Sequence, residues 1–308
     1  MGILKIEDVA YVRFRAPDLA EMRGFLEDFG LAVVEATPTR LVARGAGSSP
    51  VAHVTELGDA GFEGVAFRAE SLADLERLAA AEGVPVESLD LPGGGSVVTL
   101  SDPDGHRVDV VAGQAPAAPL AVAKAQAWNR LGAHERLRAT KRIHAGAANV
   151  VRLGHVVLNV SNFRASEQWY KERLGFITSD EIRLSPDFAL GAFLRCDRGE
   201  APTDHHTLFL MQGRSGPGFN HAAYEVADLD DLMRGHQRLR DAGRHAEWGV
   251  GRHILGSQVF DYWRDPWGHT LEHWTDGDLF TAADGSNIAS VQDLLGVQWG
   301  PKPPPTMG

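Results

Sequence analysis

Three residues in the second half of the chain have the types and positions needed to bind one metal ion. His155 and His221 each lie in the first strand of a predicted repeat unit, and Glu272 lies in the last strand of the later unit. Two imidazoles and one carboxylate form a facial ligand set that suits Fe(II) or Mn(II) and leaves coordination positions open. An open site of this kind is typical of catalysis, so the sequence predicts a catalytic metal centre here.

A comparison within the chain supports this prediction. At the equivalent positions, the first half has Tyr11, Gly64 and Asp109, which do not make such a site. Residues needed only for packing are expected in both halves, and the Asp-Pro-x-Gly-His pattern does occur in both. The ligand set occurs in one half alone, which indicates that it serves function.

Two other interpretations of these residues stay open. A single histidine in a strand is more often a packed core residue than a ligand, although three residues from matching positions favour a metal. Structural zinc prefers thiolates, and the only cysteine, Cys196, lies outside the pattern. Catalytic zinc bound by the same two histidines and one glutamate is the second alternative.

An internal repeat provides the strands that position these residues. Each unit reads as an alternating strand, an amphipathic helix, a glycine turn and two or three short strands. The units span about residues 8–58, 61–112, 153–212 and 218–278. The repeat predicts an α+β fold of two domains, each built from two βαβββ modules that form a curled, barrel-like mixed sheet.

The boundaries follow from the repeat and from composition. We expect a degenerate N-terminal domain at residues 1–113 and a catalytic C-terminal domain at residues 151–298. Residues 114–150 are expected to form a largely helical linker that packs across the domain boundary. Residues 299–308 are rich in proline, so an extended tail on the surface is expected.

Composition restricts the partners and the location. The chain has 30 Lys and Arg against 41 Asp and Glu, and its net charge of −11 disfavours nucleic acid or an anionic membrane as a partner. A small neutral or metal-chelating substrate is easier to accommodate. One cysteine cannot form an intrachain disulfide, the start does not resemble a signal peptide, and no apolar run reaches about 18 residues. We therefore expect a cytoplasmic protein.

Three further residues are candidates for proton transfer and hydrogen bonding, namely His206, His253 and Tyr262. An imidazole with an unperturbed pKa near neutrality suits acid and base catalysis, and a phenol can donate to a metal-bound oxygen. Neighbouring residues in a strand point to opposite faces, so only one of His205 and His206 is expected to face the cavity. By the same rule, His273 faces away if Glu272 faces the metal.

Read together, five segments resemble the type I extradiol dioxygenases of the vicinal oxygen chelate superfamily. They are GHVVLNV (Gly154–Val160), DHHTLFL (Asp204–Leu210), FNHAAYEV (Phe219–Val226), GRHILGSQVFDYWRDPWG (Gly251–Gly268) and LEHW (Leu271–Trp274). The resemblance covers nearly the whole chain, including the degenerate first domain. It implies an Fe(II)-dependent enzyme of the EC 1.13.11 type, commonly a homo-oligomer. Such an enzyme inserts O₂ into a catechol-type diol and opens the ring next to a hydroxyl, in aromatic-compound catabolism.

The same resemblance implies a role for each candidate residue. The three residues of the metal centre are the iron ligands, with Mn(II) as the alternative metal. His206 assists dioxygen activation and proton transfer, while His253 and Tyr262 bond the substrate's ligated hydroxyl. Biphenyl-diol members usually carry an Asn-Asp pair soon after the equivalent of His253, whereas Leu255 and Gly256 follow here. The surroundings of His253 therefore differ from those of such members.

Two rival functions stay open for this chain. A metal-dependent lyase or isomerase of the same superfamily, glyoxalase-like or epimerase-like, is the alternative function, but it usually spreads its site over both halves. A module that sequesters a drug or a metal complex is the third candidate function, and it has no need of acid and base groups at the family spacing.

Three phenylalanines could pack in the core or line a substrate pocket. The periodic placement of Phe188, Phe193 and Phe209 favours core packing, with a wall around an aromatic ring as their other role.

Overall fold

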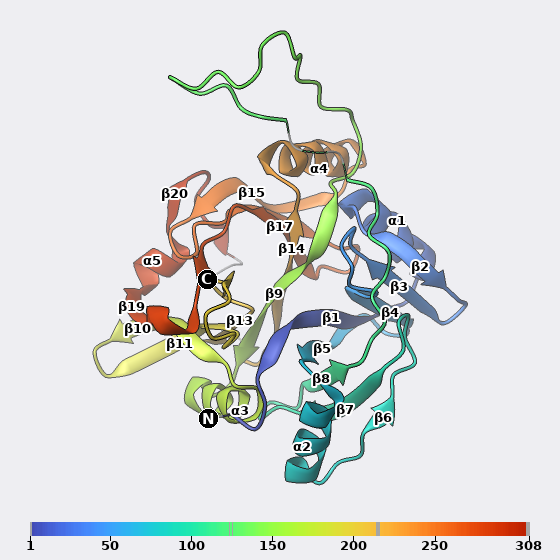
Figure 1. The fold of residues 1–308 in the computed structure, drawn as a ribbon, viewed down its shortest axis with the longest axis vertical. Helices are drawn as coiled ribbons and strands as arrows, with labels where there is room; N and C mark the ends of the chain where they lie inside the picture. Colours follow the sequence, from blue (N-terminus) through green and yellow to red (C-terminus); the bar gives the residue numbers. More distant parts are fainter. Residues whose placement is uncertain (1, 123, 125, 214–215, 306–308) are drawn as a thin grey trace.

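The computed structural model describes residues 2–122, 124, 126–213 and 216–305 (Figure 1). Four modules follow one another in the order that the repeat predicts. The first two comprise β1 (Ile6–Ala16), α1 (Leu19–Phe29), β2 (Ala32–Ala36), β3 (Arg40–Arg44), β4 (His53–Leu57), and then β5 (Gly61–Ala69), α2 (Leu72–Glu82), β6 (Glu87–Ser88), β7 (Ser96–Ser101) and β8 (Arg107–Ala112).

The second half repeats this order with additions. Its modules comprise β9 (Val150–Val160), α3 (Phe163–Leu174), β10 (Ile177–Ser185), β11 (Phe188–Arg195), β12 (Thr203–Asp204), β13 (Leu208–Gln212), and then β14 (Gly218–Val226), α4 (Leu229–Asp241), β15 (His245–His253), β16 (Val259–Arg264) and β17 (Thr270–Thr275). After them come β18 (Leu279–Phe280), the 3₁₀ turn η1 (Ala282–Asp284), β19 (Asn287–Ser290), α5 (Val291–Leu295) and β20 (Val297–Trp299).

The ends of the helices follow from local chemistry. Side chains of Asp18, Ser71, Asn162 and Asp228 accept hydrogen bonds from backbone N–H groups in the first turns of α1 to α4. Gly175 ends α3 in the left-handed conformation, which costs a glycine little. Similar N-terminal caps occur in all four modules, and each helix ends before the strand that follows it begins.

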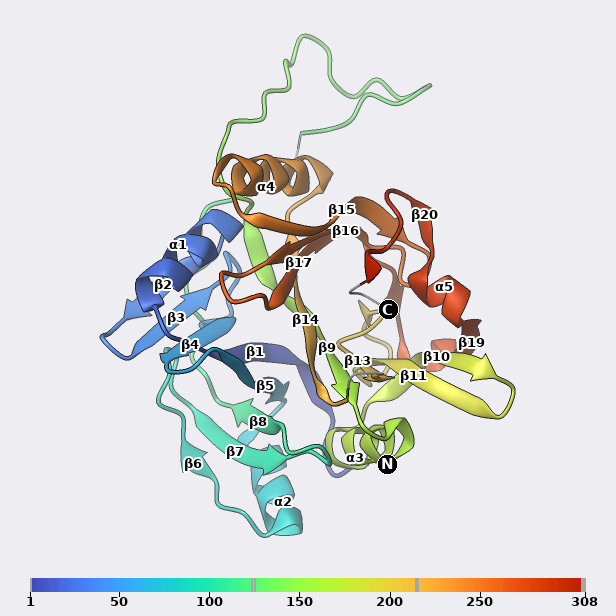
Figure 2. The same ribbon diagram turned by 180° about the vertical axis from the view of Figure 1, so that it is seen from behind.

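Each half forms one curled mixed sheet. The first sheet has eight strands in the order β2-β3-β4-β1-β5-β8-β7-β6, and the second has ten in the order β19-β10-β11-β13-β9-β14-β17-β16-β15-β20. Figures 1 and 2 show the helices α1 to α4 on the periphery, around these sheets. The predicted α+β class and its paired modules are confirmed.

The strand register places the compared residues of the two halves at equivalent points. His155 pairs with Ala223, which in turn pairs with Glu272. In the first sheet, Tyr11 pairs with Ala66, which pairs with Asp109. The alignment made from sequence therefore matches the register of both sheets.

The two sheets share one apolar core. A single cluster of buried side chains runs from α1 and β1 into β9, α3 and β14. Phe29 stacks on His273 with ring centroids 3.9 Å apart, and its carbonyl oxygen accepts a hydrogen bond of 2.7 Å from His273 Nε2. His53 Nδ1 lies 3.0 Å from the Tyr224 hydroxyl. These contacts hold the second sheet against the first.

The prediction of a largely helical linker is wrong. No helix occurs between β8 and β9 in the residues described, and the one feature there is an isolated bridge between Arg130 and Ala133. The first part lies on the first domain, where Leu120 N–H donates to Ala46 O. The middle of the segment projects away from the body (Figures 1 and 2), whereas its end returns to the protein, where Lys141 pairs with Asp230 and Asn149 N–H donates to Asp231 of α4. A helix in water needs an apolar face to bury, and Leu131 and Leu137 find none.

The C-terminal segment is partly built into the second sheet. Trp299, placed in the tail by sequence, ends β20, which pairs with β15. Pro301 O accepts a hydrogen bond of 3.0 Å from Trp248 Nε1. Residues 306–308 of the predicted tail lie outside the described residues. Among the helices that the structure describes, none has the length and apolar character to span a membrane.

Candidate metal centre

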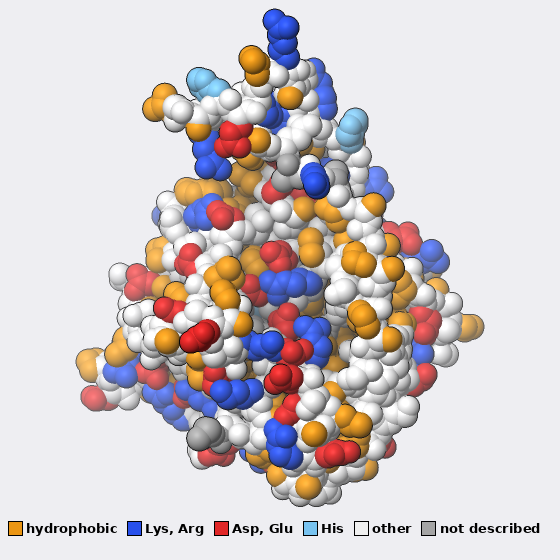
Figure 3. All heavy atoms as spheres, viewed as in Figure 1, with side chains coloured by type: hydrophobic (Ala, Val, Ile, Leu, Met, Phe, Trp, Pro, Cys, Tyr) orange, Lys and Arg blue, Asp and Glu red, His pale blue; other side chains and the backbone are white. Residues whose placement is uncertain are grey.

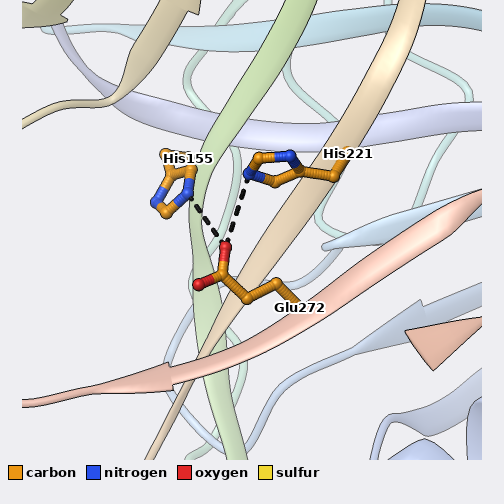
Figure 4. A group of neighbouring side chains, drawn as sticks. All are labelled: His155, His221 and Glu272. Carbon is orange, nitrogen blue, oxygen red and sulfur yellow. Dashed lines mark ion pairs between the residues drawn. The ribbon is translucent and has the colours of Figure 1, made fainter. Parts of the chain in front are cut away.

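Three neighbouring strands bring the predicted ligands together. His155 on β9, His221 on β14 and Glu272 on β17 point toward one another (Figure 4). The Nε2 atoms of His155 and His221 lie 3.3 and 3.4 Å from Glu272 Oε2. One ligand atom from each residue lies within 4.8 Å of the others, and all three side chains are buried.

The chemistry of this cluster fits a divalent cation. Within the described residues, neither carboxylate oxygen of Glu272 has a hydrogen-bond partner, although Glu272 is fully buried. Burial raises the pKa of Glu272 to about 7 and lowers the pKa of His155 to about 3. A buried carboxylate without partners is costly unless a cation neutralises it. Ligands bound at about 2.0–2.2 Å in a right-angled arrangement lie roughly 3 Å apart, close to the spacings found.

One neighbour that sequence reasoning missed orients His221. Its Nδ1 lies 2.8 Å from Asn220 Oδ1, and Asn220 Nδ2 donates to Asn159 Oδ1 at 3.3 Å. A partner on the second ring nitrogen fixes the nitrogen that faces a metal. Asn220 directly precedes His221, yet nothing in the spacing distinguished it from a surface amide.

A cavity of about 70 Å³ opens beside His155 and His221, and His206, His253 and Tyr262 also line it. The Tyr262 hydroxyl and His253 Nε2 are 2.9 Å apart, and His253 Nε2 lies 3.8 Å from Glu272 Oε1. The His206 ring lies against the His155 ring, with centroids 4.0 Å apart. Five of the six residues singled out in the sequence therefore line one cavity, and Glu272 lies behind them with its Oε2 3.3 Å from His155 Nε2.

The expected neutral pKa values of His206 and His253 are wrong. Burial lowers the pKa of His253 to about 4 and lowers that of His206 well below its usual value. Burial also raises the pKa of Tyr262 well above its usual value. The pattern of strands gave no measure of burial, so sequence reasoning assumed values typical of exposed side chains.

Only one of each neighbouring pair faces the site, as expected, although His205 and His206 lie between β12 and β13 and not in a strand. His206 lines the cavity, whereas His205 does not and instead lies 2.6 Å from Asp180 Oδ2 through its Nε2. Glu272 faces the ligands, and His273 faces the first domain, where it contacts Phe29. The contact between Asp180 and His205 was not foreseen, because 25 residues separate the two in sequence.

The wall of the cavity is mostly apolar. Its apolar lining consists of Val157, Phe193, Phe209, Met211, Trp248, Leu255, Leu294 and Leu295. Phe193 and Phe209 are stacked with centroids 4.1 Å apart, so they serve both core packing and the wall. Phe188 is 42% exposed and does not line the cavity. Leu255, which departs from the family pattern, forms part of the wall, and the partner of His253 is Tyr262.

The equivalent place in the first domain is occupied by protein cations. Asp109 accepts hydrogen bonds from the Tyr11 hydroxyl at 3.1 Å, from Arg13 Nε at 3.1 Å and from Arg107 Nε at 2.8 Å. A Cβ atom on Gly64 would come 2.4 Å from Arg107 O, so a histidine does not fit there without movement. Two guanidinium groups neutralise Asp109, whereas the equivalent Glu272 is surrounded by imidazoles and pairs with no Lys or Arg among the described residues.

The chain is similar to known proteins in sequence and in fold. The family model of the glyoxalase/bleomycin resistance protein/dioxygenase superfamily matches residues 152–273. Metapyrocatechase 2 of Cupriavidus necator is 31% identical over 309 residues, covering 97% of this chain and 90% of that protein. The manganese-dependent 2,3-dihydroxybiphenyl 1,2-dioxygenase of Geobacillus genomosp. 3 is 29% identical over 160 residues, covering 50% of each.

Two further similarities concern the metal and the fold. The iron-dependent extradiol dioxygenase of Rhodococcus jostii is 24% identical over 303 residues, covering 89% of this chain and 90% of that protein. The Mn(II)-bound glyoxalase of Novosphingobium aromaticivorans superposes with a TM-score of 0.79 at 24% identity, covering 99% of this chain and 94% of that one. The last likeness concerns the fold alone.

The similarity to metapyrocatechase 2 over nearly the full length of both proteins shows that the chain belongs to the extradiol dioxygenases of the vicinal oxygen chelate superfamily. It is a metal-dependent enzyme of the EC 1.13.11 type, which uses O₂ to open a catechol-type ring beside a hydroxyl.

Proposed function

We propose that His155, His221 and Glu272 hold the metal of this extradiol dioxygenase. The observation that carries the proposal is the buried Glu272 carboxylate, which lies between two imidazole nitrogens and has no hydrogen-bond partner among the described residues. We further propose Fe(II) as the metal, with Mn(II) as the alternative, because two nitrogens and one oxygen suit both. The relatives named for iron and for manganese support both metals equally.

The other three residues are proposed to handle protons and to hold the substrate. A divalent metal held by His155, His221 and Glu272 would supply the Lewis-acid and electron-transfer chemistry that joins a catechol to dioxygen. The Tyr262 hydroxyl and His253 Nε2, 2.9 Å apart, would hydrogen-bond the substrate's ligated hydroxyl oxygen. His206 would take a proton from the substrate and return it later in the reaction. Burial lowers the pKa of His206, so the ring is neutral at neutral pH and has a nitrogen lone pair available for this proton.

The cavity wall favours a catechol with an uncharged, apolar substituent. Eight apolar side chains line the cavity, and its polar lining outside the candidate residues is Asn220 and Gln258. No Lys or Arg is among the described residues that line it. A carboxylate substituent would lose its hydration there without gaining a cationic partner, which is costly.

The activity is tested by oxygen uptake after anaerobic reconstitution with Fe(II) or Mn(II), using catechols with alkyl, aryl and carboxylate substituents. We expect oxygen consumption and a yellow ring-fission product, with alkyl or aryl catechols preferred over the carboxylated one. Turnover of a hemithioacetal without oxygen uptake would instead support the lyase alternative. That alternative is disfavoured because Asp109 is already paired with Arg13 and Arg107.

We propose that the protein is a homo-oligomer and that residues 126–143, called the arm, contact a second copy. The arm is held in shape by hydrogen bonds between Asn129 and Arg136, while Leu131 and Leu137 are 105% and 88% exposed. It carries five Lys and Arg against one Glu, on a chain with a net charge of −11. Figure 3 shows Lys, Arg and hydrophobic side chains together on this projection. A basic, apolar arm complements the acidic surface of another copy.

Light scattering coupled to gel filtration tests the arm. We expect a mass that is a multiple of 33.3 kDa for the wild type. The double variant Leu131→Asp with Leu137→Asp should elute as a monomer, whereas Leu72→Asp, on an exposed position of α2, should not change the mass. A monomeric wild type, or a double variant that assembles normally, contradicts the proposal. Binding of the wild-type arm to anionic vesicles would indicate a membrane surface as its partner instead.

We also propose a cytoplasmic location. The single cysteine, Cys196, is a free thiol, which suits the reducing cytoplasm. The thiol is buried, and burial raises its pKa, so it is protected from oxidation. Fractionation of the producing cells tests this proposal, with activity expected in the cytoplasmic fraction and its recovery outside the cytoplasm contradicting the location.

A further inference from the structure

Asp180, His205 and His206 form a line of hydrogen bonds that ends at the cavity. His205 Nε2 lies 2.6 Å from Asp180 Oδ2, and His205 Nδ1 lies 3.0 Å from His206 Nδ1. All three side chains are buried. His206 lines the cavity, whereas Asp180 and His205 do not. The two outer residues are therefore connected to the cavity by hydrogen bonds through His206.

The surroundings of His205 hold its ring in place. Its carbonyl oxygen accepts a hydrogen bond of 2.6 Å from Ser179 Oγ, and its ring lies between Phe193 and Phe280, with centroid distances of 5.2 and 5.4 Å. Gly256 has a φ of +75°, and a Cβ atom there would come 3.0 Å from His205 Nδ1. Glycine at this position thus leaves room for the imidazole and suits the backbone.

The direction of the hydrogen bonds follows from what each group can donate. An ionised carboxylate only accepts, so His205 Nε2–H donates to Asp180. A neutral His205 then has a lone pair on Nδ1, which can accept from His206 Nδ1–H. With its single proton on Nδ1, His206 keeps Nε2 unprotonated, and that nitrogen is the one left for the cavity.

We propose that Asp180 and His205 are positioning residues that hold His206 with its proton on Nδ1, so that Nε2 is free to accept a proton. The inference rests on the proposed role of His206 as the acid and base. In the step concerned, the O–H bond of a substrate hydroxyl breaks and an Nε2–H bond forms, and the same proton later returns to the product. The resulting imidazolium is stabilised because its Nδ1–H still donates to His205, which Asp180 orients in turn.

The position of the proton can be measured without activity. In metal-free protein labelled with ¹⁵N-histidine, two-bond ¹H–¹⁵N correlations distinguish the tautomers, and the His206→Gln variant assigns the signals of His206. We expect a protonated Nδ1 and an unprotonated Nε2 on His206. If His206 carries its proton on Nε2 and its Nδ1 is unprotonated, the inference is wrong, whatever reaction the protein catalyses.

Kinetics of Asp180→Asn provide the second test. An asparagine keeps the shape of the side chain but can donate to His205 Nε2, which favours the opposite tautomer in both rings. We expect kcat with a catechol to fall by about 10- to 100-fold, as for other residues that orient a catalytic group, with KM and metal content close to the wild type. The His206 signals should change in the same variant.

The matched control is His269→Gln, which breaks another imidazole–carboxylate pair of the same domain. In this pair His269 Nδ1 lies 2.8 Å from Asp265 Oδ2, and neither residue lines the cavity. This variant should leave kcat and the His206 signals unchanged. Wild-type kcat in Asp180→Asn, or a loss explained by metal content alone, contradicts the positioning role. If the reconstituted wild type consumes no oxygen with any catechol, the proposed function fails, and the tautomer measurement still decides this inference.

Discussion

Glu272 is the residue whose energetics depend most strongly on the proposed metal. Its carboxylate is fully buried, and in the metal-free protein burial raises its pKa from 4.5 to about 7. The unfolded chain releases this proton near pH 4.5, while the folded chain holds it until about pH 7. Between these values the folded state binds more protons, so its stability falls as pH rises. A bound cation would remove this penalty by stabilising the ionised form.

The variant Glu272→Gln tests this at the level of the residue, because glutamine cannot ionise. In the presence of a chelator, the wild type should lose up to about 3 kcal/mol of unfolding free energy relative to the variant between pH 5 and pH 8. Urea denaturation at both pH values measures the difference. Parallel pH dependences of the two proteins would show that Glu272 is not held in a desolvated state.

The sequence predicted the site residues better than their environment. His155, His221 and Glu272 were distinguished because the other half of the chain offers a built-in comparison, and strand periodicity told which neighbours face inward. The link from Asp180 to His205 could not be predicted, because it joins β10 to the turn between β12 and β13 and no repeat relates the two. The pKa shifts were missed for a similar reason, since desolvation depends on how the whole domain closes over the site.

Among the elements, β9 carries the most constrained position near the site. Gly154 precedes His155 on this strand, and the Trp274 side chain of β17 lies directly over it. A Cβ atom on Gly154 would come 2.5 Å from Trp274 Cζ2, and Trp274 is itself buried. The glycine therefore leaves room for the Trp274 side chain, which reaches over it from β17 on the far side of β14.

Replacing Gly154 by alanine should destabilise the fold by about 1–3 kcal/mol, because Trp274 must move in a well-packed region. We also expect weaker metal binding, since His155 and Glu272 adjoin the displaced residues. Denaturation of the metal-free protein and metal titration measure the two effects. The control Gly218→Ala, in β14 with no atom within 4 Å of the added Cβ, should stay within about 0.5 kcal/mol of the wild type. Equal stability of the two variants would contradict this view of β9.

The modules were predictable because caps, glycine turns and alternation act locally and recur four times. The linker was not, because its alanine and basic residues suit a helix while the structure offers no surface that would stabilise one. In the residues described, this segment is instead held by a few side-chain contacts such as those between Asn129 and Arg136. Helix propensity alone therefore gave a wrong prediction for this segment, which packs against neither sheet along most of its length.

In the whole molecule, the first domain packs against the second sheet. The place in the first domain that corresponds to the candidate metal centre is filled by Arg13 and Arg107. Phe29 packs on His273, which lies directly after the proposed ligand Glu272 in β17. All seven tryptophans of the chain lie between Trp128 and Trp299, so fluorescence reports on the second half and the linker. Because one core cluster extends through both sheets, we expect the domains to unfold together.

Phe29→Ala should therefore shift the tryptophan transition as much as the far-ultraviolet circular dichroism transition. Loss of a fully buried phenylalanine costs about 3–5 kcal/mol. Leu72→Ala, at an exposed position of the same domain, should leave both transitions near those of the wild type. A fluorescence midpoint that does not move in Phe29→Ala would mean that the second domain folds independently.

The metal content of three proteins after anaerobic reconstitution with Fe(II) tests most directly where the catalytic metal is held. Wild type and Tyr11→Phe, which alters only the filled site of the first domain, should each retain close to one metal ion per chain. His221→Ala should retain almost none, because it removes one of the three ligands. Equal metal content in His221→Ala and Tyr11→Phe would contradict a metal centre formed by His155, His221 and Glu272.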